Sequence, residues 1–135
     1  MELPRIFLLI VFVPLLFARF ASAQGPEPKT KVIDRNDNGK EIAITEGEIF
    51  EVRLQQAGGT GYLWQIVDPD ETHLKVLEST ETPLKEGRIV GGPLLKTWKI
   101  KAVKAGHTHL KILLYRPWEG TGKAAESFEV KIRIK

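Results

Sequence analysis

Apolar and polar residues alternate at every second position over much of this chain. The alternation recurs in five runs, whose apolar members are Ile42 and Ile44; Phe50, Val52 and Leu54; Trp98, Ile100 and Ala102; Leu110, Ile112 and Leu114; and Phe128, Val130, Ile132 and Ile134. A period of two places alternate side chains on opposite faces of a β-strand. The intervening residues are mostly Lys, Arg, Glu and Thr, so one face of each strand packs on a core and the other meets water. The pattern predicts an all-β fold.

We predict seven strands, at about 41–45, 48–55, 62–67, 73–79, 96–103, 107–115 and 127–134, with a candidate eighth at 30–34. Strands of this number and length are typical of an immunoglobulin-like antiparallel β-sandwich. Trp64 lies where such sandwiches often keep a central tryptophan, so we expect its side chain in the core.

The first 23 residues have the pattern of a secretory signal peptide. Arg5 precedes an apolar run from Ile6 to Phe17, and Ala21-Ser22-Ala23 is a small-residue cleavage site. The apolar run is shorter than the roughly 20 residues that a transmembrane helix needs. We therefore expect a signal peptide at 1–23, a disordered lead at 24–29 and one domain at 30–135, secreted or periplasmic, with no membrane attachment after signal removal.

Composition excludes several functions. The chain has no cysteine, which removes disulfides, thiolate catalysis and thiolate metal ligands. Without Glu2, Arg5 and Arg19 of the leader, 18 basic and 16 acidic residues remain, with the two signs interspersed. The lysines are expected to be solvated positions along strands, rather than a basic groove for nucleic acid; they are Lys96, Lys99, Lys101, Lys104 and Lys111. Lysines expected on an edge strand, such as Lys131 and Lys135, favour a monomer, because charged edges discourage strand pairing.

The sequence gives little support for a metal site or a catalytic site. Residues 34–41 alternate oxygen-bearing side chains like a calcium loop, but the twelfth position is Thr45 rather than Glu, and Asn38-Gly39 predicts a hairpin turn. His107 and His109 would share one strand face, with no third ligand indicated by spacing. Ser79 and Ser127 lack the context of a catalytic serine. We predict no catalytic residue, no metal and no cofactor, and hence no enzyme.

Three turn-rich connections remain, and they carry the candidate site. If successive strands alternate in direction, the connections after every second predicted strand lie at one end of the sandwich. These connections contain Gly58, Gly59, Thr60, Gly61 and Tyr62; then Val90, Gly91 and Gly92; then Arg116, Pro117 and Trp118. Glycine lets a partner's backbone approach, and proline limits the directions in which Arg116 and Trp118 can point. Together they suit binding in a cleft, unless Trp118 instead folds back over the sandwich end.

The order of these segments resembles the chagasin-like family of cysteine-peptidase inhibitors. That family has an Asn-Pro-Thr-Thr-Gly-Tyr-x-Trp loop, a glycine-rich central loop and an Arg-Pro-Trp/Phe loop on an immunoglobulin-like sandwich. This chain has Ala57-Gly58-Gly59-Thr60-Gly61-Tyr62-Leu63-Trp64, Val90-Gly91-Gly92 and Arg116-Pro117-Trp118. It departs from the pattern where Ala57-Gly58-Gly59 replaces Asn-Pro-Thr, and where Ile89 replaces a glycine.

The resemblance implies a reversible inhibitor of papain-like cysteine peptidases, which occludes the active-site cleft without forming a bond. It implies that the Gly58–Tyr62 segment covers the reactive cysteine while the other two segments grip the cleft walls. The flexible Ala57-Gly58-Gly59 stretch is expected to cost more entropy on docking than a proline-containing loop. The alternative is a non-inhibitory immunoglobulin-like module that uses the same end to bind a surface, peptide or glycan ligand.

Overall fold

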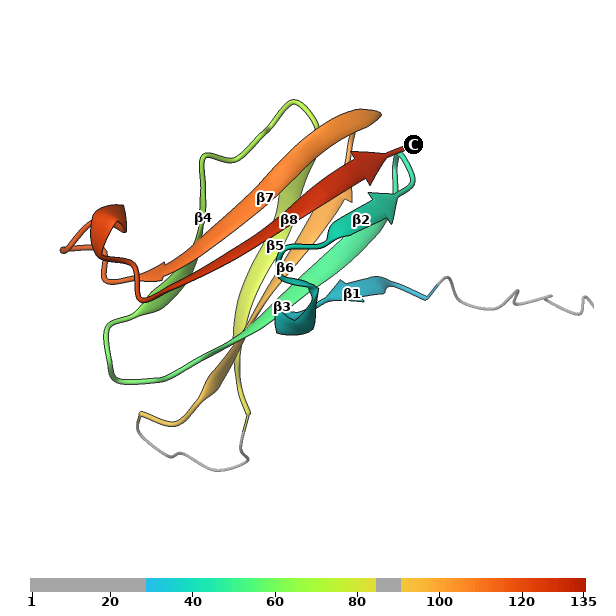
Figure 1. Cartoon of the computed structure of the whole chain (residues 1–135). Coiled ribbons are helices and arrows are strands. Elements are labelled where there is room, and N and C mark those ends of the chain that lie inside the picture. Colours follow the sequence, from blue (N-terminus) through green and yellow to red (C-terminus); the bar gives the residue numbers. More distant parts are fainter. Residues whose placement is uncertain (1–28, 85–90) are drawn as a thin grey trace, which may run out of the picture.

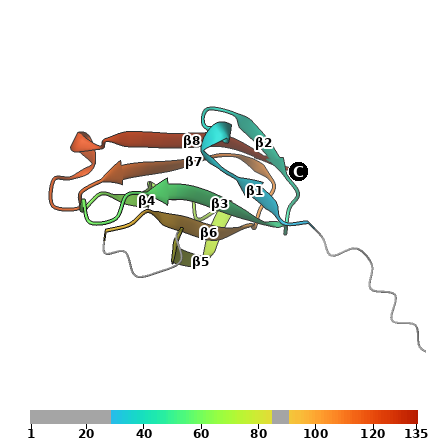
Figure 2. The ribbon, with the colours of Figure 1, turned by 90° about the horizontal axis from the view of Figure 1, so that it is seen from below.

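The computed structural model describes residues 29–84 and 91–135, which form two four-stranded sheets (Figure 1). The first sheet has the order β1-β3-β6-β5 and contains β1 (Lys31–Ile33), β3 (Ile49–Gln56), β6 (Leu94–Ala102) and β5 (Leu74–Pro83). The second has the order β2-β8-β7-β4 and contains β2 (Glu41–Ile44), β8 (Glu126–Ile134), β7 (Gly106–Tyr115) and β4 (Leu63–Val67). Figure 2 shows the sheets as two layers.

These eight strands confirm the predicted all-β sandwich, including the candidate first strand. The described residues also contain two short 3-10 helices, η1 (Arg35–Asp37) and η2 (Thr121–Lys123). The predicted signal peptide at 1–23 and all but the last residue of the lead at 24–29 lie outside the described residues. In the part of the chain that the structure describes, no helix is long and apolar enough to span a membrane.

Strand β5 ends at Pro83 rather than at about residue 79 as predicted. The alternation of inward-facing and outward-facing residues along it is also interrupted. Its register with β6 shifts between Val76 and Glu78, which is the mark of a β-bulge. Leu77 is the extra residue, so the outward-facing positions change parity along the strand. After Leu74 every residue of β5 is exposed, and an exposed edge strand carries little hydrophobic pattern from which to read its end.

The prediction that all strands are antiparallel was wrong for the first two. Strand β1 runs parallel to β3, and β2 runs parallel to β8. The chain therefore crosses from one sheet to the other between β1 and β2, through η1. Such parallel edge pairs leave the side-chain period at two, so periodicity cannot distinguish them from antiparallel pairs.

The same crossover explains why Asn38-Gly39 does not form the predicted hairpin. Asn38 has φ −53° and ψ 128°, Gly39 has φ 80°, and the Lys40 amide donates to the Asp37 carbonyl, which is a type II turn. The Gly39 amide donates to the Glu129 carbonyl, and Asn38 Oδ1 accepts from the Glu129 amide at 2.9 Å. The turn thus starts the pairing of the following strand with β8.

The core lies between the sheets and is apolar. Trp64 is buried as predicted, beside side chains from both layers; the largest fully buried ones include Phe50, Phe128, Ile100, Ile112 and Ile132. Burying one such side chain contributes about 1.5–3 kcal/mol before the entropy cost of folding. Packing of this kind holds the two sheets together in a chain that has no cysteine.

One of the lysines predicted to be solvated is largely buried. Lys96 shares the inward-facing row of β6 with Trp98 and Ile100, and its side chain is only 18% exposed. Its Nζ lies 3.2 Å from Glu81 Oε1 and 5.7 Å from the Trp98 ring centroid. The positive charge of Lys96 is therefore paired with the carboxylate of Glu81 on β5, at the edge of the core. Lys101 is partly buried, whereas Lys99, Lys104 and Lys111 are exposed as predicted.

Candidate functional site

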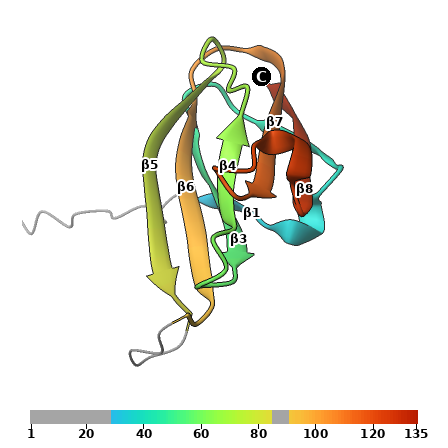
Figure 3. The ribbon, with the colours of Figure 1, turned by 90° about the vertical axis from the view of Figure 1, so that its left-hand side faces the viewer.

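Three connections meet at one end of the sandwich (Figure 1 and Figure 3). We call residues 57–62, 91–93 and 116–120 the three-loop surface. They belong to the β3–β4, β5–β6 and β7–β8 connections, respectively. The β3–β4 connection is central: Gly58 lies against the backbone of Gly91 and Gly92, and Gly61 lies against the Trp118 indole. The structure therefore brings together the segments that the sequence placed at one end. Val90 lies outside the described residues.

The β3–β4 connection is closed at its base by two hydrogen bonds. Gln56 Oε1 accepts from the Trp64 amide at 2.9 Å, and Trp64 Nε1 donates to the Gln55 carbonyl at 2.8 Å. At the tip, Gly59 and Gly61 have φ of 74° and 79°, values that glycine adopts without strain.

Thr60 is exposed at the tip of this connection. Its hydroxyl is partly engaged inside the turn, because Oγ1 accepts from the Tyr62 amide at 3.3 Å and donates to the Ala57 carbonyl at 3.4 Å. These are long hydrogen bonds, so they leave the hydroxyl available to a partner's donor or acceptor. Tyr62 itself is half-buried.

The β5–β6 connection approaches Gly58 through its backbone. A Cβ added to Gly58 would overlap the Gly92 carbonyl oxygen and would lie 2.9 Å from the Gly91 carbonyl carbon. Only a residue without a side chain fits there. The Leu84 amide donates to the Pro93 carbonyl at 3.1 Å, which joins the two described ends of this connection.

The β7–β8 connection begins with a turn in which the Glu119 amide donates to the Arg116 carbonyl at 2.9 Å. Pro117 occupies the second position of the turn, where its fixed φ is favourable. Trp118 follows and is 71% exposed, so the alternative in which it folds back over the sandwich end was wrong. One edge of its indole rests on Gly61, where a Cβ would overlap ring atom Cη2. The rest of the ring is free for a partner.

Arg116 joins the two connections. Its Nε donates to the Thr60 carbonyl at 3.0 Å, and its guanidinium carbon lies 4.4 Å from the Tyr62 ring centroid and 5.9 Å from that of Trp118. Its Nη1 lies 3.4 Å from Glu119 Oε1. The arginine thus makes several contacts within the protein.

The sequence interpretation missed Gln56, which is 3% exposed. Its signal was present, because Gln56 continues the inward-facing row formed by Phe50, Val52 and Leu54. A polar residue at a core position must find a hydrogen-bond partner, and this one closes the base of the loop.

Possible metal ligands and nucleophiles do not gather at the three-loop surface. Among residues 29–84 and 91–135, no three His, Asp or Glu side chains are close enough to hold a metal ion. His107 and His109 share the outward face of β7, as expected, and His109 Nδ1 lies 3.5 Å from Glu129 Oε1. What the surface offers is an exposed indole, two exposed glycines (Gly59 and Gly91) and a threonine hydroxyl, which suit binding rather than chemistry.

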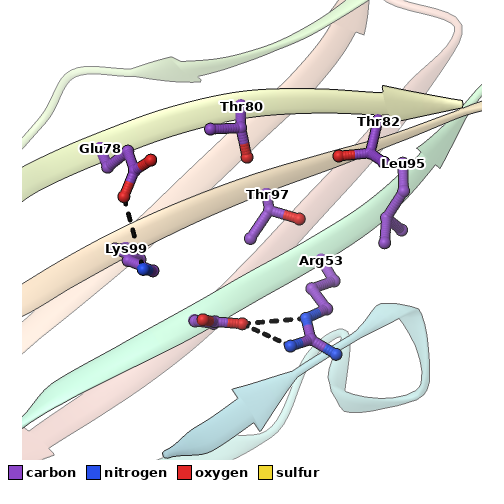
Figure 4. Close-up of a pocket in the computed structure, with 8 residues that line it drawn as sticks. Arg53, Glu78, Thr80, Thr82, Leu95, Thr97 and Lys99 are labelled. Carbon is purple, nitrogen blue, oxygen red and sulfur yellow. Dashed lines mark hydrogen bonds and ion pairs between the residues drawn. The ribbon is translucent and has the colours of Figure 1, made fainter.

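A separate hollow of about 300 Å³ lies on the outer face of the β1-β3-β6-β5 sheet (Figure 4). Its charged groups pair with one another: Arg53 with Glu51 at 2.6 Å, and Lys99 with Glu78 at 3.4 Å. The hollow is open and its charges are compensated, so the three-loop surface is the stronger candidate.

A family model and two curated relatives all point to the same protein family. The model of the chagasin family peptidase inhibitor I42 matches residues 43–132. Amoebiasin-2 of Entamoeba histolytica is 22% identical over 104 residues, which are 77% of this chain and 85% of the relative. Chagasin of Trypanosoma cruzi is 26% identical over 107 residues, which are 75% of this chain and 94% of the relative.

Solved structures agree in fold. The crystal structure of the cysteine protease inhibitor EhICP2 from Entamoeba histolytica has a TM-score of 0.70 at 21% identity and covers 78% of this chain and 96% of that one. PbICP-C, solved in complex with falcipain-2, has a TM-score of 0.54 at 23% identity and covers 78% of this chain and 99% of that one. With the family model matched across most of the sandwich, from β2 to β8, the chain belongs to the chagasin family of peptidase inhibitors.

Proposed function

We propose that this protein is a reversible inhibitor of papain-like cysteine peptidases and that the three-loop surface occludes the active-site cleft. The observation that carries the proposal is the meeting of three connections at one end of the sandwich, where Gly59, Thr60 and Gly91 are exposed and Trp118 is 71% exposed beside them. Family membership and the solved complex of one relative with falcipain-2 support the same conclusion.

Each segment has a proposed part in docking. Residues 58–62 would lie over the reactive cysteine, since residues 58–61 offer carbonyl and amide groups with little side-chain bulk. Gly91 and Gly92 would meet one wall of the cleft, and Pro117 and Trp118 the other. A rigid tryptophan at the edge of such a surface loses little entropy and buries much apolar area when a partner arrives.

Inhibition by occlusion needs no bond between inhibitor and peptidase. A standard interface buries about 800 Å² on each partner, and nanomolar binding corresponds to about −12 kcal/mol. The mechanism requires no nucleophile, metal or cofactor of the inhibitor, so we propose that the protein is not an enzyme. We also propose that it acts as a monomer, because the three-loop surface is complete in one chain. The expectation that Lys131 lies on an edge strand was wrong, since β8 lies between β2 and β7, so this lysine carries no argument about strand pairing.

The test is a titration of the purified protein against papain and a cathepsin-L-like peptidase, with a serine peptidase as the control. We expect dose-dependent inhibition of the cysteine peptidases, reversed by dilution, and no effect on the serine peptidase. No inhibition at micromolar concentrations of folded protein would contradict the proposal, and would favour a non-inhibitory binding module.

We further propose that the protein is exported, to the periplasm or the extracellular medium, after cleavage following Ala23. The basis is the sequence of the leader, with Arg5, the apolar run at 6–17 and Ala21-Ser22-Ala23. N-terminal sequencing of the exported protein should begin at Gln24. Retention of an uncleaved chain in the cytoplasm would contradict this proposal.

A further inference from the structure

We propose that Arg116 is a positioning residue: it orders the tip of the β3–β4 connection from within the three-loop surface, and it does not serve mainly as a contact with the peptidase. The functional part of this inference rests on the proposed inhibition. The structural part concerns the free protein and stands independently of it.

The contacts of Arg116 are directed inward. Its side chain is 34% exposed. Nε donates to the Thr60 carbonyl at 3.0 Å, the guanidinium carbon lies over the Tyr62 ring at 4.4 Å from its centroid, and Nη1 lies 3.4 Å from Glu119 Oε1. A planar guanidinium can stack and donate in its own plane at the same time, which a lysine ammonium cannot do. Arg116 thus directs both its cation–π contact and its hydrogen bond at the protein's own groups.

The tip of the β3–β4 connection needs such support from outside. Gly58, Gly59 and Gly61 give it a flexible backbone, and Gln56 and Trp64 fix only its base. The hydrogen bonds of Thr60 within the tip are 3.3 and 3.4 Å long. The bond from Arg116 is shorter, charge-assisted and anchored on a different connection.

Arg116 also links the tip to the neighbouring tryptophan. Its guanidinium carbon lies 5.9 Å from the ring centroid of Trp118, and the indole edge rests on Gly61. Residues 60–62 and 116–119 are therefore held as one unit before any partner arrives. Ordering a loop in advance lowers the entropy cost of binding, so loss of the arginine should weaken inhibition even if the arginine never meets the peptidase.

The experiment compares Arg116→Ala and Arg116→Lys with the control Lys123→Ala, which removes a positive charge from the same connection. Amide hydrogen exchange of residues 57–62 is measured in the free protein, and the inhibition constant is measured with papain. We expect faster exchange and an inhibition constant raised about tenfold or more for both Arg116 variants, and neither change for Lys123→Ala. Tyr62→Leu removes the aromatic partner of Arg116 and should also give faster exchange of residues 57–62. In a double variant, Tyr62→Leu should add little to the effect of Arg116→Ala.

The outcomes separate the alternatives. Weaker inhibition with unchanged exchange of residues 57–62 would make Arg116 a direct peptidase contact and would overturn the inference. If the unaltered protein inhibits papain and Arg116→Ala leaves the inhibition constant unchanged, the functional part of the inference is overturned. If the unaltered protein inhibits no cysteine peptidase, the proposed function fails, and the exchange data alone then decide whether Arg116 orders the loop. Far-UV circular dichroism confirms that each variant is folded.

Discussion

Gln56 Oε1 accepts a hydrogen bond of 2.9 Å from the backbone amide of Trp64, and this bond links the two sheets beneath the three-loop surface. Gln56 ends β3 in one sheet, and Trp64 lies in β4 of the other. Both residues are about 3% exposed. Water cannot replace either partner, so the bond fixes where the β3–β4 connection leaves the sandwich.

The first prediction concerns this bond. Gln56→Leu keeps the side-chain volume but leaves the buried Trp64 amide without its acceptor, so we expect a loss of about 1–3 kcal/mol in the free energy of unfolding. Urea denaturation measures it. Gln55→Leu is the matched control, because Gln55 faces outward on the same strand. Equal stability of the two variants would show that the buried bond contributes little.

A second prediction concerns Trp118, which is 71% exposed. Trp118→Ala should weaken inhibition of papain by more than about 1 kcal/mol, because an exposed, preorganised indole is a typical interface anchor. The unfolding midpoint should not change. Val103→Ala removes another exposed apolar side chain, beyond the far end of β6, and should leave inhibition unaltered. An inhibition constant unchanged by Trp118→Ala would remove this residue from the binding site.

The third prediction concerns the approach of two loop backbones. Gly58→Ala places a Cβ against the Gly91 and Gly92 backbone, so the β5–β6 connection must move away from the β3–β4 connection. We expect changed amide NMR shifts at Gly91 and Gly92 and an inhibition constant several-fold higher.

Gly122→Ala is the matched control for this substitution. Gly122 has open space around its Cα and no positive φ, so an alanine there should be neutral or slightly stabilising. Unperturbed Gly91 and Gly92 signals in Gly58→Ala would contradict the close approach.

The sequence predicted the strands and the common end of the three connections because both depend on local patterns. Phe50, Val52 and Leu54 reveal a buried face by periodicity alone. Parallel pairing of β1 with β3 and of β2 with β8 could not be predicted in this way, because it depends on which sheet each short strand joins.

Contacts between particular side chains also could not be predicted from the sequence. The parity of Lys96 with Trp98 shows that it faces inward, but the pairing with Glu81 follows from the bulge in β5, which shifts the register of that strand. Arg116 was expected to contact a peptidase. Its contact with the Tyr62 ring depends on how close two connections lie that are far apart along the chain, which the spacing of residues in the sequence does not reveal.

The last prediction concerns acid stability at the end of the sandwich opposite the three-loop surface, where the β4–β5 connection meets β7 (Figure 1). Asp70 Oδ2 accepts from Thr108 Oγ1 at 2.7 Å and lies 2.7 Å from His73 Nδ1. Asp70 Oδ1 accepts from the Thr72 amide at 3.2 Å. The hydrogen bond from Thr108, followed by that from His73, lowers the pKa of Asp70 below its ordinary value of 3.8.

A lowered carboxyl pKa stabilises the folded state above the unfolded value, and that contribution is lost as pH falls through the folded pKa. We therefore expect Asp70→Asn to unfold at lower urea than the unaltered protein at pH 7, and the difference to shrink below about pH 3.8. Asp68→Asn, which removes an exposed carboxylate two residues away, is the matched control for the loss of one negative charge from this connection. Inhibition at neutral pH should be the same for both variants, because the hydrogen bonds of Asp70 lie at the far end from Trp118. A urea difference that persists undiminished to pH 2 would mean that the carboxylate charge does not stabilise this end of the sandwich.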